Sequence, residues 1–294
     1  MTDQLAILKP GVVVDKYELT EMLGQGGFGV VYEGVSDDDQ SVALKFSKED
    51  CIAFINEAET LRQLKGTGLA PELFSVGNYK GLHFICMEEA TGSVLDIIHM
   101  SMQGELSSQV IQKILYQTHS ALEAIHEKGF LHQDMKAENL FLTAPDNRNT
   151  VRIIVGDWGM AVRQKNGQKI TGDIDVRPGG TVWYSSASAL LGNDYTVLDD
   201  ILMLTYCSWC FQSLNIDDFS GENSVNYKIS LLKDPFENLP DALQWLLPYF
   251  SSIQEAINDE GIDYGKIREG IEDVLRDTDG TEEIRFVGGE NILE

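Results

Sequence analysis

Basic residues are scarce in this sequence of 294 residues. The chain contains 22 lysines and arginines against 47 aspartates and glutamates, which gives a formal net charge of -25. A field of that sign repels phosphate backbones and anionic lipids, so we expect no direct binding to nucleic acid and no binding to a membrane. It favours basic protein partners, although an acidic surface that only maintains solubility explains the same charge. The sequence does not indicate an oligomeric state.

Cysteines and long apolar runs are also scarce. The four cysteines are too few and too scattered for a disulfide framework, and no apolar run reaches the ~18 residues of a membrane span. The N-terminus has no basic region followed by an apolar core. We therefore expect an intracellular protein, cytoplasmic or nuclear. Cys207 and Cys210 form a C-x-x-C pair in an apolar run, where packing is a better interpretation than redox chemistry or zinc binding.

Chemically active residue types concentrate in one decapeptide, HQDMKAENLF at residues 132–141. Asp134 can accept a proton from a hydroxyl group, Lys136 can neutralise a phosphoryl group in transit, and Asn139 can offer an oxygen to a hard metal ion. Apolar periodicity upstream, ending at Gly129, predicts a helix that leads into this stretch as a loop. Together these residues indicate phosphoryl transfer.

A glycine pattern near the N-terminus could supply the phosphate cradle. Gly24, Gly26 and Gly29 follow the spacing G-x-G-x-x-G, but the residues that follow, VVY, favour a strand rather than the helix of a dinucleotide-binding unit. We therefore expect strand, glycine turn and strand, with bare backbone amides that can approach an anion. The β-prone run SVALKF at residues 41–46 then predicts a third strand.

Two further acidic residues are candidates by position. Residues 47–50 resemble a capping box, and Ile55, Ala58, Leu61 and Leu64 recur at helical spacing. Glu57 lies beside this stripe, where it either pairs with Lys45 or is an ordinary exposed glutamate. Residues 139–142 and 151–155 predict a hairpin that returns Asp157 beside Asn139.

With these motifs in order, the chain resembles a eukaryotic-type protein kinase over residues 17–276. The resemblance rests on the glycine loop, on Lys45 in the sequence VALK, on Glu57, on the loop with His132, Asp134, Lys136 and Asn139, and on the triplet Asp157-Trp158-Gly159. Within the superfamily the chain is most similar to the casein kinase 1 and vaccinia-related kinase branch. That likeness lies in the sequences GTVWYSS (180–186), DDIL (199–202), NYKIS (226–230) and DYGKIR (263–268), and no Ala-Pro-Glu closes the activation segment.

The resemblance implies an α+β, bilobal protein kinase fold. We expect a small β-rich N-lobe with one helix at about 17–87, and a larger, mainly helical C-lobe at about 91–276. A lead at 1–16 and an acidic, flexible tail at 277–294 would flank them. Nothing in the sequence says what the tail does.

The family's mechanism assigns roles to these residues. The resemblance implies a serine/threonine protein kinase in which Asp134 is the base, Lys136 offsets charge on the γ-phosphate, and Lys45, held by Glu57, binds the ATP phosphates. Asn139 and Asp157 would hold Mg²⁺. The residues expected to surround ATP are Leu23, Gly24, Gln25, Gly26, Gly27, Phe28, Gly29, Val31, Ala43, Lys45, Met87, Glu88, Ala90, Asn139 and Asp157.

Three departures from the family pattern sharpen the expectations. Gln133 replaces the usual arginine that grips a loop phosphate, so we expect activity that does not depend on loop phosphorylation. Trp158 replaces a phenylalanine, as in casein kinase 2. Trp183 replaces a basic residue that reads acidic substrates in casein kinase 1, which favours a basic protein substrate here.

Two alternatives from other classes stay open. A pseudokinase would bind nucleotide or a partner without transfer, but such proteins usually lack a catalytic residue, and this chain retains Lys45, Asp134, Asn139 and Asp157. A small-molecule phosphotransferase of the aminoglycoside type is the other alternative. The glycine hairpin and Lys136 favour the protein kinase over it.

Overall fold

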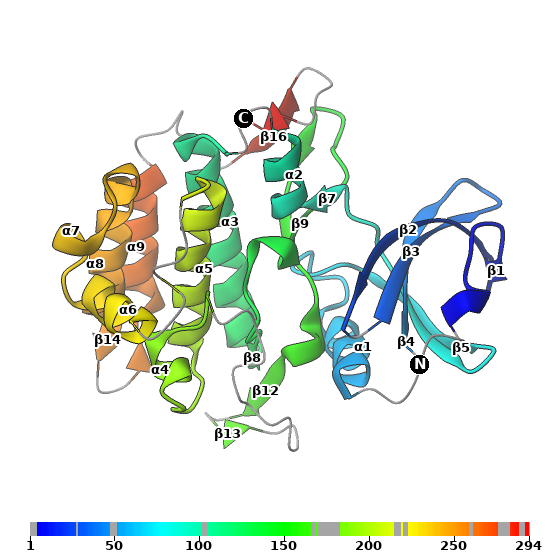
Figure 1. The fold of residues 1–294 in the computed structure, drawn as a ribbon, viewed down its shortest axis with the longest axis horizontal. Helices are drawn as coiled ribbons and strands as arrows, with labels where there is room; N and C mark the ends of the chain where they lie inside the picture. The colour runs from blue at the N-terminus through cyan, green and yellow to red at the C-terminus, as the bar shows by residue number, and fades with distance from the viewer. Residues whose placement is uncertain are drawn as a thin grey trace. The chain divides into compact units, whose positions relative to one another are not determined.

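The computed structural model describes residues 5–27, 29–47, 52–101, 105–165, 168–169, 183–214, 219, 223–258, 261–275, 283–287 and 292–293. It divides into two compact units. Unit 1 comprises Met1–Thr91 and Gly156–Ala161, and unit 2 comprises Gly92–Val155 and Val162–Glu294. The predicted fold class is therefore confirmed: one unit is rich in strands and the other is mainly helical (Figure 1).

Unit 1 is an antiparallel sheet of six strands with one α-helix among its described residues. The strand order is β1-β2-β3-β4-β6-β5, with bounds Val13–Val14, Tyr17–Gly26, Gly29–Ser36, Ser41–Ser47, Leu82–Met87 and Leu73–Tyr79. Helix α1 spans Ile52–Leu64, and short 3-10 turns lie at Leu5–Ile7 and Trp158–Met160. The strand pattern expected for residues 17–46 is therefore correct. The capping box expected at residues 47–50 extends outside the described residues.

The described part of the lead, residues 5–16, contributes to the core of unit 1. Leu8 and Val14 are buried in one hydrophobic cluster with Leu44 and Phe46 of β4. Strand β1 pairs with β2, with Val14 opposite Tyr17. Burial of this apolar surface stabilises the unit, so the described part of the lead is structural rather than a loose extension.

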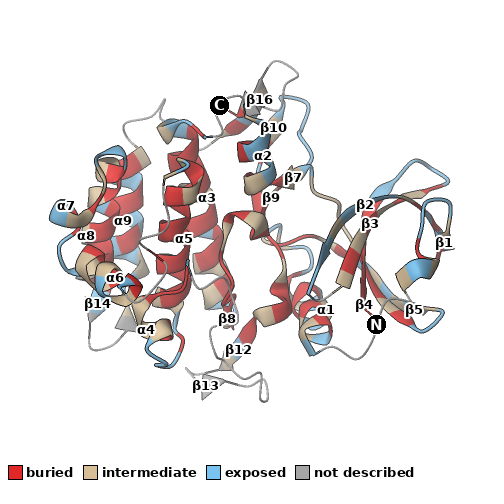
Figure 2. Cartoon of the chain, viewed as in Figure 1, coloured by how far each residue is buried: buried red, intermediate tan, exposed pale blue. Residues whose placement is uncertain are grey.

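Unit 2 consists mainly of helices. They are α2 Val94–Met100, α3 Ser108–Glu127, α4 Ala187–Leu190, α5 Val197–Phe211, α6 Ser224–Lys233, α7 Pro235–Asn238, α8 Leu247–Ala256 and α9 Tyr264–Leu275, with 3-10 turns at Ala137–Asn139 and Asp241–Leu246. Helices α3 and α5 lie side by side, and almost every residue of α5 is buried (Figure 2). Cys207 is fully buried and Cys210 is a free thiol, which supports the packing interpretation of the C-x-x-C pair.

Short strands complete unit 2. They are β7 Gly92–Ser93, β8 Phe130–Leu131, β9 Leu140–Leu142, β10 Thr150–Val151, β11 Ile153–Val155, β12 Val162–Lys165, β13 Gln168–Lys169, β14 Ile257–Asn258, β15 Gly261–Ile262, β16 Ile284–Val287 and β17 Ile292–Leu293. Strand β9 pairs with β11 as the predicted hairpin, with Leu140 opposite Val155. None of the described helices is long and apolar enough to cross a bilayer.

The tail differs from expectation at its described residues. Strand β16 pairs with β10, which places Ile284 opposite Val151, and both side chains are fully buried. Arg148 forms an ion pair with Glu283 at 3.3 Å. Residues 283–287 are therefore packed on unit 2, and the description as a flexible tail does not hold for them.

Candidate functional site

The glycine pattern lies in the hairpin of β2 and β3, where Gly26 pairs with Gly29. A Cβ atom added at Gly29 would lie 1.9 Å from the carbonyl oxygen of Phe46, whereas one added at Gly24, Gly26 or Gly27 meets nothing within 4 Å. Packing therefore requires glycine at position 29. At Gly24, Gly26 and Gly27 packing does not require glycine. The missing side chains leave the backbone amides accessible, which a loop that binds an anion through its amides requires. Phe28 lies outside the described residues.

Lys45 is a buried cation held by two carboxylates of unit 1. Its Nζ donates to Oε2 of Glu57 at 2.5 Å and to Oδ1 of Asp157 at 3.0 Å. Burial opposes the charge of Lys45, but the two carboxylates outweigh burial and raise the pKa of Lys45 above its ordinary value. The lysine is thus a fixed positive charge, and the alternative of an exposed Glu57 is excluded because its side chain is only 3% exposed.

Helix α1 buries Leu61 and Leu64 of the predicted stripe but not Ile55. Its buried residues include Phe54, Glu57, Leu61 and Leu64, whereas Ile55 is 53% exposed. The predicted stripe contained Ile55 and left Glu57 at its margin. The inward face is centred on Glu57 instead, because the carboxylate must reach Lys45 on β4.

Asp157 stands at a strained point of the backbone. Its φ of 57° is left-handed, and a 3-10 turn begins directly after it. The side-chain amide of Asn56 on α1 holds this turn by donating at 3.3, 3.1 and 2.5 Å to the carbonyl oxygens of Trp158, Gly159 and Ala161. Asn56 could not be predicted from the sequence, since one polar residue within a helix carries no signal of such contacts.

The remaining nucleotide candidates of unit 1 follow the strands. Ala43 of β4 lies opposite Met87 of β6, and Val31 of β3 lies opposite Lys45. Leu23 and Gln25 are exposed, and Glu88 and Ala90 are half-buried in the segment that follows β6. Oε2 of Glu88 accepts from the amide of Glu72 at 3.1 Å, and the Glu88 amide donates to the Glu72 carbonyl oxygen at 2.8 Å, so two hydrogen bonds hold the start of this segment to Glu72.

The predicted catalytic loop forms a compact cluster in unit 2. Lys136 Nζ donates to Oδ2 of Asp134 at 2.8 Å, and Nδ2 of Asn139 donates to the same oxygen at 3.2 Å and to the Asp134 carbonyl at 2.7 Å. Asp134 and Asn139 are 5% and 3% exposed. Lys136 and Asn139 therefore both contact Asp134. Because the Asn139 amide nitrogen donates within the loop, its oxygen is the atom with which this side chain could hold a metal ion.

The loop is fixed to helix α5 through Asp200. The amides of His132 and Gln133 donate to its carboxylate at 2.8 and 2.9 Å, and Gln133 takes a left-handed φ of 68° there. Tyr195 and His126 also bond to Asp200, at 2.6 and 2.9 Å. Burial opposes ionisation of Asp200, but these hydrogen bonds and nearby histidines outweigh it and lower its pKa. In the sequence Asp200 is part of a family motif, and nothing there predicts that it holds the loop.

The two predicted metal ligands belong to different units, Asp157 to unit 1 and Asn139 to unit 2. Within the described part of the chain, no group of three or more His, Cys, Asp or Glu side chains could hold a metal ion. Magnesium that also binds substrate phosphates needs only one or two protein carboxylate or carbonyl oxygens. Asp157 of unit 1 and Asn139 of unit 2 each offer one such oxygen donor.

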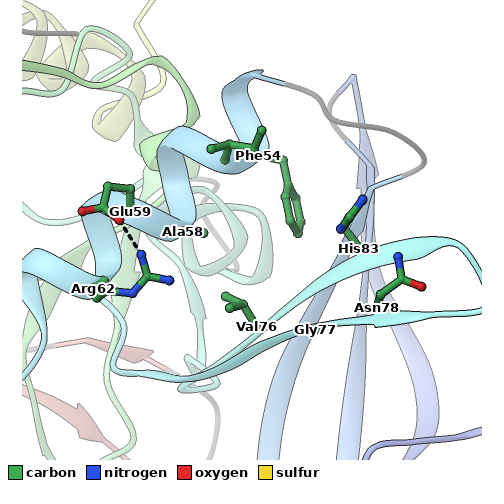
Figure 3. Close-up of a pocket in the computed structure, with 9 residues that line it drawn as sticks. Phe54, Ala58, Glu59, Arg62, Val76, Gly77, Asn78 and His83 are labelled. Atoms are coloured by element: carbon green, nitrogen blue, oxygen red, sulfur yellow. Dashed lines mark hydrogen bonds and ion pairs between the residues drawn. The ribbon is translucent and has the colours of Figure 1, made fainter.

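Unit 1 also contains a pocket formed by helix α1, β5 and β6 (Figure 3). Its volume is about 490 Å³, and its lining includes Phe54, Ile55, Val76 and His83. Glu59 and Arg62 form an ion pair at its edge. Lys45 and Glu57 do not line it, so this pocket is separate from the buried lysine.

Comparison with known proteins adds independent information. A family model for the protein kinase domain matches residues 17–214. A probable casein kinase I homolog of Encephalitozoon cuniculi is 32% identical over 67% of this chain and 62% of its own length. Casein kinase I homolog 2 of Schizosaccharomyces pombe is 25% identical over 90% of this chain and 64% of its own length. The chain thus spans less than two thirds of these two relatives.

A solved structure of similar fold agrees with this likeness. The structure of vaccinia related kinase 3 superposes with a TM-score of 0.72 and covers 94% of each chain. Its sequence identity is 19%, so this likeness bears on the fold alone.

Proposed function

Because the chain belongs to the protein kinase family, we propose that it transfers the γ-phosphate of ATP to the hydroxyl group of a serine or threonine in a protein. The observation that carries this proposal is the cluster of Asp134, Lys136 and Asn139, in which the cation and the oxygen ligand both contact the proton acceptor Asp134. Phosphoryl transfer needs positioning and charge stabilisation more than covalent chemistry, and this set supplies both.

Each residue then has a specific task. Asp134 accepts the proton of the substrate hydroxyl as that oxygen attacks phosphorus. Lys136, which already contacts the Asp134 carboxylate, offsets negative charge on the transferred group. Lys45 binds the α- and β-phosphates as a cation whose charge is kept by Glu57. Gly24, Gly26 and Gly27 let the hairpin cover the phosphates and exclude water.

The proposed cofactors are ATP and Mg²⁺. Asp157 and Asn139 would hold the ion, which neutralises phosphate charge when it is bound. Leu23, Gln25, Phe28, Gly29, Val31, Ala43, Met87, Glu88 and Ala90 are the proposed surroundings of the nucleotide. The left-handed backbone at Asp157, fixed by Asn56, supports a metal-binding role, because such strain is typical of functional positions.

The substrate class follows from charge. A net charge of -25 attracts basic polypeptides, and Trp183, which is 45% exposed, offers no positive charge to an acidic one. We therefore propose basic proteins as substrates. The acceptor is serine or threonine because Lys136 matches the lysine of kinases with that specificity. Loop phosphorylation stays a separate prediction, since residues 170–182 lie outside those described.

Transfer of radiolabel from γ-labelled ATP to a mixture of basic proteins tests the proposal. Wild type should label serine or threonine, and Asp134→Asn should lower the rate about 10²- to 10⁴-fold, the usual worth of a positioned base. Asp241→Asn, at an exposed aspartate of the same unit, should retain the wild-type rate. Nucleotide binding without transfer by wild type would indicate a pseudokinase, and transfer only to a small molecule would indicate a phosphotransferase of the other type.

A further inference from the structure

Lys228 is a buried lysine that the proposed mechanism does not use. It lies on helix α6 and is 1% exposed. Its Nζ donates to the carbonyl oxygen of Ser185 at 2.7 Å and stands 5.5 and 5.3 Å from the ring centroids of Tyr206 and Phe219. Burying an ammonium group is costly, so its retention here calls for a specific contact to explain it.

The residue that Lys228 holds belongs to a short segment, Trp183 to Ser186, whose members differ sharply in exposure. Tyr184, Ser185 and Ser186 are at most 4% exposed, whereas Trp183 is 45% exposed. The segment is thus anchored by three consecutive residues and presents one large aromatic side chain outward. An exposed tryptophan on a fixed backbone is a typical contact residue for a polypeptide partner.

The segment is joined to the same helix that fixes the catalytic loop. Ser186 Oγ donates to Asp199, and Asp199 precedes Asp200, whose carboxylate holds the amides of His132 and Gln133. Tyr184 is hydrogen-bonded to Cys210 of α5, and its pKa is raised chiefly by burial, with a smaller effect from the charge of Glu138 in the catalytic loop. The segment and the Asp134 loop therefore share one support within unit 2.

We propose that Lys228 is a positioning residue for the protein substrate. By donating to the Ser185 carbonyl, it fixes the backbone that carries Trp183. The Trp183 side chain then packs against an apolar side chain of the substrate next to the acceptor residue. The inference rests on the proposed function and adds a specificity determinant to it. Lys228 contacts neither ATP nor the acceptor hydroxyl in this proposal. Its loss should therefore weaken substrate binding without altering how ATP is bound.

Steady-state kinetics with a basic serine peptide test the proposal. Lys228→Met removes the donor but keeps the side-chain length, and it should raise KM for the peptide about ten- to hundredfold while KM for ATP stays within about twofold. Trp183→Ala, at an exposed position that folding tolerates, should raise the same KM about tenfold. Lys113→Met, at another lysine of unit 2 that is 4% exposed, is the matched control and should leave the peptide KM unchanged.

The double variant and a pair of peptides separate the possible results. Lys228→Met combined with Trp183→Ala should raise the peptide KM little more than Lys228→Met alone, because the two residues act in sequence. Wild type should prefer leucine to glycine beside the acceptor, and Trp183→Ala should remove that preference. An unchanged peptide KM in Trp183→Ala would overturn the inference even if Lys228→Met failed to fold. Additive effects of Lys228→Met and Trp183→Ala on the peptide KM would overturn it too, as would equal rises in the KM for the peptide and the KM for ATP. Absence of peptide labelling by wild type would instead reject the proposed function.

Discussion

Two buried lysines, one in each unit, show how differently a protein can hold the same side chain. Lys45 is 9% exposed and contacts the carboxylates of Glu57 and Asp157, which raise its pKa despite burial. Lys228 is 1% exposed and contacts a carbonyl oxygen and two aromatic rings, and burial lowers its pKa to about 7. The surroundings therefore favour the charged form at Lys45 and disfavour it at Lys228.

The difference teaches what each position requires. A lysine that must bind phosphate has to stay charged at every physiological pH, and paired carboxylates ensure this. A lysine that must hold a backbone carbonyl can do so in either protonation state, because the neutral amine also donates. Disrupting each lysine should consequently have distinct effects on activity and on stability.

The largest effect is expected from Lys45→Met. Loss of the cation leaves Glu57 buried without its partner, which should lower the free energy of unfolding by about 3–5 kcal/mol. Phosphate transfer should fall at least about 100-fold, since charge stabilisation at the phosphates is lost. Adding Glu57→Gln should recover part of the stability and none of the activity. Urea unfolding and the radiolabel assay measure the two quantities.

Lys65→Met is the control for that experiment. Lys65 is a lysine of unit 1 whose side chain is 52% exposed, so its ion pair with Glu72 should contribute less than about 1 kcal/mol. A Lys45→Met protein as stable as wild type would show that the buried pair adds nothing to the fold.

A smaller effect on stability is expected from titrating Lys228, because burial disfavours the charge of this lysine whereas the carboxylates favour the charge of Lys45. Its pKa is about 7 in the folded protein against 10.5 as the ordinary value, so the unfolded chain binds more protons between these two pH values. Stability should therefore rise with pH across this window, with a slope of at most about 1.4 kcal/mol per pH unit. The measurement is the unfolding free energy of wild type minus that of Lys228→Met at pH 6, 7.5 and 9. Subtraction cancels the groups common to both proteins, and a flat difference would show that the pKa of Lys228 is not lowered.

The smallest effect is expected from Asn56→Ala. Like Lys228, Asn56 holds backbone carbonyls, but it does so without any charge, so this variant isolates the contribution of the hydrogen bonds. Removing its amide should cost about 1–2 kcal/mol and loosen the turn that follows Asp157. The catalytic rate should fall more than the peptide KM rises. Gln63→Ala, at a half-buried position of the same helix that makes no hydrogen bond with the Asp157 turn among the described residues, should leave both unchanged. Thermal unfolding and kinetics in magnesium titrations provide the readouts, and an unchanged magnesium dependence would argue against a role at Asp157.

The sequence predicted the parts of the site in which side-chain type and spacing are dictated by chemistry. Asp134, Lys136 and Asn139 lie within six residues, so their cluster needs only one loop. For Glu57 the residue pattern left two interpretations, and only the family resemblance implied its pairing with Lys45. Asn56 and Lys228 act on backbone carbonyls, which any sequence possesses, so residue type alone could not identify their partners.

Errors in the fold had a similar origin. On α1 the sequence predicted a buried Ile55 and left Glu57 at the margin, because periodicity favours apolar residues for the inward face. Glu57 is buried instead because it pairs with Lys45 on β4. The pairing of β16 with β10 joins residues far apart in the chain, and acidic composition around Ile284 hides it.

The buried N-terminal lead has a practical consequence for anyone expressing this chain. A clone trimmed to the boundaries of the family match, residues 17–214, would begin after β1 and remove Leu8 and Val14 from the interior of unit 1. The hydroxyl of Tyr32 would lose the Leu8 carbonyl to which it donates at 3.2 Å. Such a fragment should be poorly soluble even though it contains every residue proposed for chemistry, and recombinant material should start upstream of Leu5.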